Sequence, residues 1–242
     1  MDMLHLIATP IGDPKDISLR AIETLKAADV VIGEEFKVLS RLLKSWDITG
    51  KSLEQLNEHS DPEDVARLLE LCRDKSVALV SDCGTPGFCD PGARLVRACR
   101  DENVAVTSLP GASSLMVLLS LLGRRADQFY FQGFLPAEKE ARAKAMATLA
   151  RRGEPFVVMD TPYRLPKIQK ELASCFKGHI VCGVRLTQPD EQILDMRLEQ
   201  FAKVELDKAE FIALVIPEKR GGTDQARRTS WGKSGKRSNR KS

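Results

Sequence analysis

The sequence predicts an α/β fold made of two domains. Short apolar, β-branched runs alternate with helical patterns, loops rich in Gly and Pro follow several of these runs, and the alternation restarts after Gly123. A helix between two strands returns the chain to the edge where the first strand began, so this order favours parallel or mostly parallel sheets. A chain of 242 residues is long enough to bury two cores. We expect domains at residues 1–112 and 113–218, followed by a tail at residues 219–242.

Four strands and four helices are predicted in the first domain. Apolar runs predict the strands, and apolar positions that recur every three or four residues predict the helices. Asp61 is placed to cap the helix that starts at Pro62. We expect strands at residues 3–9, 30–33, 76–81 and 104–109, and helices at residues 17–28, 37–45, 62–73 and 93–101.

The second domain opens with a strongly apolar helix at residues 113–122 and continues the same alternation. Each domain should therefore contain a mixed or mostly parallel sheet flanked by helices. We expect further helices at residues 138–152, 165–175 and 198–201, and strands at residues 128–132, 156–160, 179–186 and 211–216, with a short strand at 193–194.

Cysteine spacing and hydropathy argue against several protein classes. The six Cys residues show no CxxC pair, and the three His residues do not join them in a zinc pattern, so we expect no metal site. All six are predicted to be small core residues in a reducing compartment. The sequence starts with an acid at Asp2 and no basic leader, and its longest apolar run, residues 115–122, is shorter than the ~20 residues of a membrane helix. A cytoplasmic protein without membrane attachment is expected.

Charge is distributed unevenly along the chain. Residues 219–242 contain nine Lys and Arg against one Asp, a net charge of +8, whereas residues 1–218 contain 28 bases and 33 acids, a net charge of −5. The tail is rich in Gly and Ser and has one aromatic residue, Trp231, so it cannot bury enough apolar surface to order itself. It is predicted to be a phosphate-seeking arm, and the alternative is a tail that only keeps the protein soluble.

Glycine-rich loops follow three of the predicted strands, although neither GxGxxG nor GxxxxGK[ST] occurs. The loops read ATPIGDPKDISLRA at residues 8–21, SDCGTPGFCDPG at 81–92 and PGASSL at 110–115. In open α/β sheets, small ligands bind at the carboxyl ends of strands, where helix N-termini offer free amides. Asp82 can accept from a cation or a sugar hydroxyl, or it can simply cap a turn. Together with the hydroxyls of Thr85, Ser113 and Ser114, it suits a zwitterionic nucleoside such as S-adenosylmethionine.

These loops resemble those of the tetrapyrrole-methylase superfamily. Within it they are most similar to the ribosomal RNA small subunit methyltransferase I family, which methylates a ribose 2′-hydroxyl in the decoding region. That family reads ATPIGN–DIT-RA, SDAGTP–SDPG, PGPSA and GFLP at the corresponding places, and this chain carries GFLP at residues 133–136. The resemblance covers residues 3–217. It implies a tetrapyrrole-methylase-like two-domain fold, with S-adenosylmethionine in the cleft between the domains, and commonly a homodimer.

The resemblance also implies which residues bind the cofactor. The strand-end loops of the first domain supply most of them, and the start of the helix at residues 113–122 and two strands of the second domain supply the rest. Carried over residue by residue, the cofactor site consists of Pro10, Ile11, Gly12, Asp82, Gly84, Thr85, Pro110, Ser113, Ser114, Met159, Asp160 and Ala213.

The chain departs from the family in the segments expected to face the substrate. EDTRHT becomes EEFKVL at residues 34–39, YHEHNE becomes LNEHSD at 56–61, YESPHR becomes MDTPYR at 159–164, and ARELT becomes GVRLT at 183–187. The adjacent pair Glu58 and His59 is retained and can take a proton from a ribose hydroxyl. Alternatively, the two residues only make polar loop contacts or lie on a dimer surface. Glu34, at the end of a predicted strand, is expected to contact the substrate. Three basic residues can steer its phosphates, or they are simply solvated surface groups: Lys37, Arg164 and Arg185.

The sequence therefore predicts an S-adenosylmethionine-dependent methyltransferase that acts on ribosomal RNA or the small ribosomal subunit. A tetrapyrrole C-methyltransferase of corrin or sirohaem synthesis is one alternative, although a small acidic macrocycle needs no basic arm. A cofactor-binding but catalytically idle RNA-binding or ribosome-assembly protein is another. The apolar residues Phe36, Val38 and Leu39 in the altered segment keep this alternative open.

Removing residues 219–242 should flatten the salt dependence of RNA binding. Each phosphate contact on a single strand contributes about −0.7 to the slope of log affinity against log salt, so engagement of roughly half of the tail's bases amounts to about 3 units. Titrating labelled RNA with the full chain and with residues 1–218 at several salt concentrations measures this change. Cofactor affinity should be equal for the two proteins. Parallel salt slopes would mean that the tail does not capture RNA.

Overall fold

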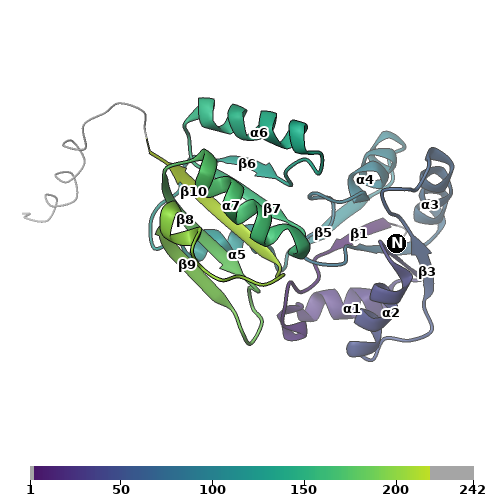
Figure 1. Cartoon of the computed structure of the whole chain (residues 1–242). Helices are drawn as coiled ribbons and strands as arrows, with labels where there is room; N and C mark the ends of the chain where they lie inside the picture. Colours follow the sequence, from purple (N-terminus) through teal and green to yellow (C-terminus); the bar gives the residue numbers. More distant parts are fainter. Residues whose placement is uncertain (1–2, 219–242) are drawn as a thin grey trace, which may run out of the picture.

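The computed structural model describes residues 3–218, which form two lobes that each contain a five-stranded sheet (Figure 1). The first sheet has the order β3-β2-β4-β1-β5, and all its neighbouring strands are parallel. Its strands are β1 (Met3–Ile7), β2 (Val30–Gly33), β3 (Ser52–Gln55), β4 (Ser76–Val80) and β5 (Val106–Leu109). Because these strands are parallel, all their carboxyl ends lie at one edge of the sheet.

Helices cover both faces of the first sheet. α1 (Leu19–Ala27) and α2 (Phe36–Ser45) pack on one face, and α3 (Pro62–Asp74) and α4 (Gly92–Asp101) pack on the other. A short 3-10 helix, η1 (Pro14–Asp16), precedes α1. The predicted cap of α3 is confirmed, since Asp61 accepts a hydrogen bond from the Asp64 amide at 2.9 Å. The sequence pattern missed β3 because this edge strand is short and mostly polar.

The second sheet is mixed and has the order β6-β7-β10-β8-β9. Only β6 and β7 are parallel neighbours, whereas β10 is antiparallel to both β7 and β8, and β9 is antiparallel to β8. Its elements are α5 (Ser114–Leu121), β6 (Tyr130–Gly133), α6 (Lys139–Arg152), β7 (Phe156–Asp160), η2 (Pro162–Arg164), α7 (Leu165–Cys175), β8 (Gly178–Val184), β9 (Gln192–Arg197), α8 (Leu198–Phe201) and β10 (Phe211–Pro217).

The antiparallel direction of β10 determines which residues reach the space between the lobes. Phe211, the first residue of β10, lies opposite Asp160, the last residue of β7. The carboxyl end of β7 and the amino end of β10 therefore share one edge. A fully parallel sheet would have put the start of β10 at the opposite edge.

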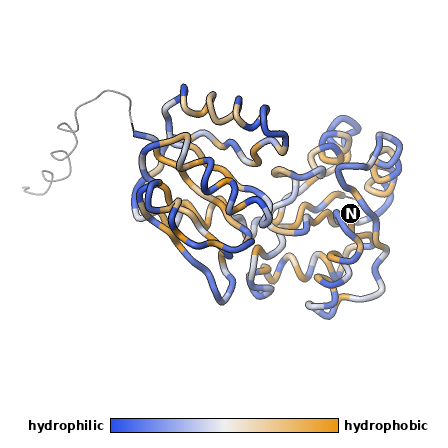
Figure 2. Tube along the Cα trace, viewed as in Figure 1, coloured by the Kyte–Doolittle hydropathy of each residue, from blue (hydrophilic) through white to orange (hydrophobic). Residues whose placement is uncertain are grey.

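Buried hydrophobic residues form the cores of both lobes, and much of the trace along the strands of both sheets is coloured hydrophobic in Figure 2. In the second lobe, α6, α7 and α8 pack on one face of the sheet and α5 packs on the other. Cys72, Cys99 and Cys182 are buried, as predicted, but the prediction is wrong for the other three cysteines. Cys83 and Cys89 lie in the glycine-rich loop after β4, and Cys175 ends α7, where no core covers them. No helix of residues 3–218 has the length and apolar character to cross a membrane.

The expected domain boundary after residue 112 falls between β5 and α5, and it stays a proposal. The basic tail at residues 219–242 lies outside the described residues.

Gly12 marks a close approach between the two lobes. A Cβ atom built on Gly12 would lie 2.5 Å from the backbone oxygen of Leu186 and 2.5 Å from the Thr187 hydroxyl, both of the β8–β9 connection. Beside it, the Asp13 amide donates a hydrogen bond to the Thr187 hydroxyl at 3.1 Å. The loop after β1 is therefore seated directly on the second lobe, and only glycine fits at this contact.

Gly12→Ala should push the loop and the second lobe apart. Overpacking of this kind lowers the free energy of unfolding by about 1–3 kcal/mol, which chemical denaturation measures. Gly123→Ala is a suitable control, because its Cβ would meet no atom within 4 Å and would carry only the strain of a positive φ. A Gly12→Ala protein as stable as the wild type would show that the lobes do not depend on this contact.

Candidate functional site

A cavity of about 550 Å³ lies where the two lobes meet. The first lobe contributes Ile11 after β1, Glu34 after β2 and the loop after β4. Ser113 and Ser114 at the start of α5 also line the cavity. The second lobe contributes Phe134 after β6, the end of β7, part of β8 with Leu186 after it, and the start of β10. This volume lies within the range of sites for cofactors and drug-sized ligands.

The loop after β4 is held in shape by its own hydrogen bonds. The Ser81 hydroxyl donates to the Gly84 carbonyl at 3.2 Å, and the Thr9 hydroxyl donates to the Ser81 carbonyl at 3.1 Å. Gly84 has a φ of +85°, a conformation that other residues rarely adopt. Thr85 donates its hydroxyl to the Ala112 carbonyl at 3.1 Å, which joins the loop after β4 to the loop after β5. The Thr85 hydroxyl is thus engaged in structure rather than free to donate to a ligand.

Most of the predicted cofactor residues line this cavity. They are Ile11, Asp82, Gly84, Thr85, Ser113, Ser114, Met159 and Asp160. The other four do not line it: Pro10, Gly12, Pro110 and Ala213. Gly12 packs against the second lobe, and Ala213 is buried in the core on the α6–α7 face. The cofactor role of all twelve residues stays a prediction.

The amino end of α5 offers hydrogen-bond donors to the cavity. Ser113 is the N-cap residue, yet its hydroxyl makes no capping hydrogen bond. Amides in the first turn of a helix have no partner within the helix and attract negative groups. Ser113 and Ser114 both line the cavity, so this end of α5 suits a carboxylate.

Carboxylates on the first lobe face the cavity in partly buried positions. Glu34 accepts a hydrogen bond from the Asp82 amide at 3.2 Å. Burial raises the pKa of Glu34 above its ordinary value, and the nearby charges of Asp82, Asp90 and Glu35 raise it further, against the lowering effect of that hydrogen bond. Burial also raises the pKa of Asp82, with a contribution from the Glu35 charge. Because both carboxylates are partly buried beside other acids, a positively charged or hydrogen-bond-donating ligand would stabilise their charged forms.

Asp160 is the most enclosed carboxylate of the cavity, with only 1% of its side chain exposed. Its Oδ1 accepts from the Thr161 amide at 2.8 Å and lies 3.1 Å from the Arg164 guanidinium, whereas its Oδ2 is buried without a partner. Burial raises the pKa of Asp160, opposed by the Thr161 amide and Arg164. An unpaired buried oxygen is costly, so Oδ2 is suited to a donor from a bound molecule.

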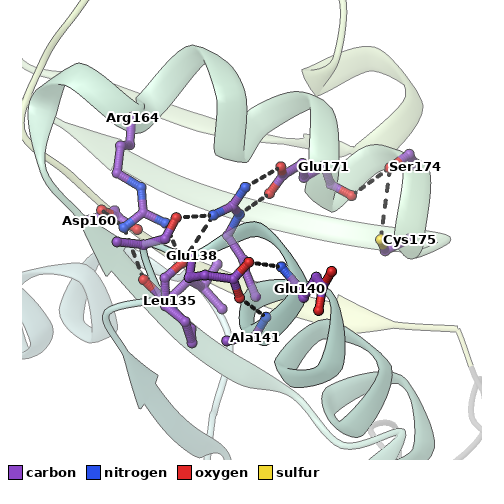
Figure 3. A network of polar contacts seen from close by, with 12 residues as sticks. Leu135, Glu138, Glu140, Ala141, Asp160, Arg164, Glu171, Ser174 and Cys175 are labelled. Carbon is purple, nitrogen blue, oxygen red and sulfur yellow. Dashed lines mark hydrogen bonds and ion pairs between the residues drawn. The ribbon is translucent and has the colours of Figure 1, made fainter.

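A network of two arginines fixes Asp160 and the connection between β6 and α6 (Figure 3). Arg142 is 1% exposed and binds both oxygens of Glu171, at 2.7 and 3.0 Å. It also donates to the carbonyls of Pro136 and Ala137. Arg164 donates to the Leu135 and Pro136 carbonyls at 3.0 Å each. The two arginines therefore hold the backbone of the β6–α6 connection, and Arg164 links it to Asp160.

A second cavity of about 650 Å³ adjoins the first and shares Glu34, Asp82, Cys89 and Asp90 with it. The predicted pair Glu58 and His59 lines this second cavity. Their side chains are both 84% exposed, and His59 Nε2 lies 3.6 Å from Glu58 Oε1. The pair therefore stands next to the first cavity in an open, solvated position, and its catalytic role stays a prediction.

Three predicted substrate residues line neither cavity. Lys37 is exposed in the first turn of α2. Arg164 is occupied by Asp160 and the β6–α6 connection, and Arg185 pairs with Asp190 at 2.9 Å. Glu34 is the only one of the four predicted substrate residues that lines both cavities.

Several residues of the first cavity are not among the site residues predicted from the sequence. Phe88 and Phe134 are each 45% exposed there, and Glu210 and Phe211 stand at the start of β10. The sequence did contain a signal for the two phenylalanines, because both lie in blocks that resemble the family, SDCGTPGFCDPG at residues 81–92 and GFLP at 133–136. Glu210 and Phe211 had none, since the direction of β10 is a property of the folded sheet.

The two cavities are markedly acidic. The first has five lining carboxylates and no Lys or Arg; its acids are Glu34, Asp82, Asp90, Asp160 and Glu210. The second adds Glu35 and Glu58, with Arg94 and His59 as its basic residues. Arg94 donates to the Ser60 carbonyl at 2.6 Å. Within residues 3–218, no group of three or more His, Cys, Asp or Glu residues is arranged to hold a metal ion.

Comparison with known proteins identifies relatives over most of the chain. A protein called ribosomal RNA small subunit methyltransferase I from Neisseria meningitidis serogroup B is 38% identical over 174 residues, which cover 72% of this chain and 60% of the relative. The matched part of the chain thus spans about 60% of the length of that relative. A protein of the same name from Borrelia garinii subsp. bavariensis is 34% identical over 220 residues, which cover 88% of this chain and 98% of the relative.

Solved structures share the fold. A crystal structure of diphthine synthase superposes with a TM-score of 0.71 at 18% identity and covers 89% of this chain and 90% of its own. Cobalt precorrin-4 methyltransferase, a cobalamin biosynthetic enzyme, gives a TM-score of 0.62 at 16% identity, with 88% and 94% covered. These two likenesses establish the two-lobed α/β fold that the sequence predicted. A family model matches residues 3–202, and the chain belongs to the family described as Tetrapyrrole (Corrin/Porphyrin) Methylases.

Proposed function

We propose that the protein is an S-adenosylmethionine-dependent methyltransferase that methylates a ribose 2′-hydroxyl of small-subunit ribosomal RNA. The observation that carries this proposal is the first cavity, whose five carboxylates have no Lys or Arg among them. Such a cavity favours a cation. The names of the relatives from Neisseria and Borrelia support ribosomal RNA as the acceptor.

The residues of the first cavity fit S-adenosylmethionine. When bound, this cofactor supplies a methyl group on a positively charged sulfonium. Asp82 and Asp160 are suited to accept hydrogen bonds from its hydroxyl and amino groups, and the unpaired Oδ2 of Asp160 would gain a partner. Ser113 and Ser114 at the start of α5 are suited to its carboxylate. Apolar contacts are available from Phe88, Phe134 and other lining residues.

The second cavity is suited to the acceptor nucleoside, because it adjoins the first along Glu34 and Asp82. Methyl transfer to a hydroxyl forms a carbon–oxygen bond, breaks the carbon–sulfur bond, and releases the hydroxyl proton. We assign that proton to the Glu58–His59 pair, which lines the second cavity. The rest of catalysis is positioning, which the fixed loops after β1, β4 and β5 provide.

Two alternatives differ from this proposal, one in the acceptor and one in having no transfer activity. Cobalt precorrin-4 methyltransferase shares the fold, which allows a tetrapyrrole substrate. The acidic walls of both cavities argue against it, because the carboxylates of such a macrocycle would meet lining carboxylates with few bases to offset them. A catalytically idle RNA-binding protein would bind the cofactor without transferring its methyl group.

The discriminating experiment measures transfer of tritium from methyl-labelled cofactor to three acceptors: small ribosomal subunits, free ribosomal RNA, and uroporphyrinogen. Labelling at ribose oxygens of RNA or subunits supports the proposal. Labelling of uroporphyrinogen alone would establish the tetrapyrrole alternative. Cofactor binding without labelling of any acceptor would establish the idle protein.

In the same assay, Glu58→Ala combined with His59→Ala should slow single-turnover transfer by roughly 100-fold or more, because a general base contributes about 10²–10⁴-fold. Glu63→Ala is a matched control, since Glu63 is an exposed acid in the first turn of α3 that lines neither cavity. Unchanged transfer by the double variant would remove the pair from the mechanism.

Cofactor binding should depend on residues of the first cavity. Asp82→Ala or Ser113→Val should weaken it by about 1–3 kcal/mol, the usual cost of losing the partner of a buried polar group. Isothermal titration calorimetry with S-adenosylmethionine measures the affinities. Asp74→Ala, at the exposed end of α3, should bind like the wild type. If the wild-type protein releases no heat and binds no labelled cofactor, the proposed cofactor is wrong.

A further inference from the structure

The acidic cavities raise the question of where an RNA substrate places its phosphates. Seven carboxylates line the two cavities, against Arg94 and His59 as the basic residues. Phosphates entering either cavity would be repelled, since like charges in a partly buried space interact strongly. An acceptor nucleotide can therefore insert its ribose only if the adjoining phosphates stay outside. A basic contact next to the cavities is needed to hold them.

The second lobe presents an aromatic and a basic side chain beside the first cavity. Tyr163 directly follows Pro162, which lines the cavity, and Lys208 precedes the lining residue Glu210 by two positions. The register of β7 and β10 pairs Asp160 with Phe211, so the segments that carry Tyr163 and Lys208 lie at the same edge of the sheet. This edge faces the first lobe (Figure 1).

These two side chains contact each other. Lys208 Nζ lies 4.8 Å from the centroid of the Tyr163 ring. Tyr163 is nevertheless 74% exposed, which is high for a large aromatic residue, and Lys208 is exposed as well. An open ring next to a cation offers a stacking surface for a base and a charge for its phosphate. We call Tyr163 and Lys208 the rim pair.

We infer that the rim pair binds single-stranded RNA next to the acceptor nucleotide: a flanking base stacks on Tyr163, and a flanking phosphate pairs with Lys208. This inference rests on the proposed RNA substrate and names the surface that receives it. The acceptor ribose then enters the second cavity while the strand stays on the rim.

The chain contains a matched control for the rim pair. Arg152 lies 4.1 Å from the centroid of the Tyr130 ring, which is the same kind of contact. Tyr130 begins β6 and pairs with Phe156 at the start of β7, whereas the cavity lies at the other end of β7, at Asp160. Arg152→Ala therefore removes a cation over a tyrosine at the end of the sheet away from the cavities.

The test uses the full chain and a labelled oligoribonucleotide of roughly 12 nucleotides, within the range of site sizes for single-strand binding. Tyr163→Ala should lower RNA affinity on the order of tenfold, and Tyr163→Phe should restore it, because stacking needs only the ring. Lys208→Ala should reduce the salt slope by about 0.7, the value for one phosphate contact. Arg152→Ala should behave like the wild type, and all four variants should bind S-adenosylmethionine normally.

Methyl transfer to ribosomal RNA provides a second readout. With the rim variants, KM for RNA should rise while kcat stays near the wild-type value. This pattern is expected when the lost contact is equally strong in the ground state and in the transition state. Wild-type RNA affinity in Tyr163→Ala, an unchanged salt slope in Lys208→Ala, or an equal loss in Arg152→Ala would overturn the inference. None of these results would affect the proposed function, which instead fails if the wild type transfers no methyl group to RNA.

Discussion

Burial of the Asp160 carboxylate is the constraint on which the second lobe's side of the cleft depends. Its Oδ1 is held by the Thr161 amide and Arg164, and Arg164 also holds two carbonyls of the β6–α6 connection. The almost fully buried Arg142 binds the next carbonyls and is itself neutralised by Glu171. Removing one member would leave buried charges or carbonyls without partners, which costs more than the pair contributes. The same contacts therefore fix the position of the Asp160 side chain, pair its charge, and hold the backbone of the β6–α6 connection (Figure 3).

In the first lobe, neutral side-chain hydroxyls rather than arginines hold the backbone around the cavity. Its parallel sheet brings the loops after β1, β2, β4 and β5 to one edge. Hydroxyls of Thr9, Ser81 and Thr85 join the loops after β1, β4 and β5 by donating to backbone carbonyls. Asp82 and Glu34 remain only partly solvated, so the pKa of each is raised. These two first-lobe carboxylates have no Lys or Arg beside them in the first cavity, and a cationic ligand would offset their charge.

The acidity of the cavities also means that the cofactor and the RNA phosphates must bind at different places. A cavity that favours a sulfonium disfavours phosphates, so binding of a polynucleotide must rely on groups outside it. Exposed bases beside the second lobe's edge, such as Lys208, are suited to that role, whereas Arg164 and Arg185 are tied to Asp160 and Asp190. Basic residues in the segments that resemble the family therefore need not bind the substrate, because ion pairs within the protein already neutralise their charge.

The sequence by itself determined the strand–helix alternation, the cap of α3, the glycine-rich loops and the family, because each is written in a short stretch of chain. It could not reveal β3, whose polar residues form a strand only by pairing with β2. The exposure of Cys83 and Cys89, the contact of Gly12 with Leu186, and the arrival of Glu210 at the cavity were also decided by the tertiary structure. Each of these depends on which distant segment lies alongside, and local periodicity and turn chemistry do not encode the direction of β10 or the fit of one lobe against the other.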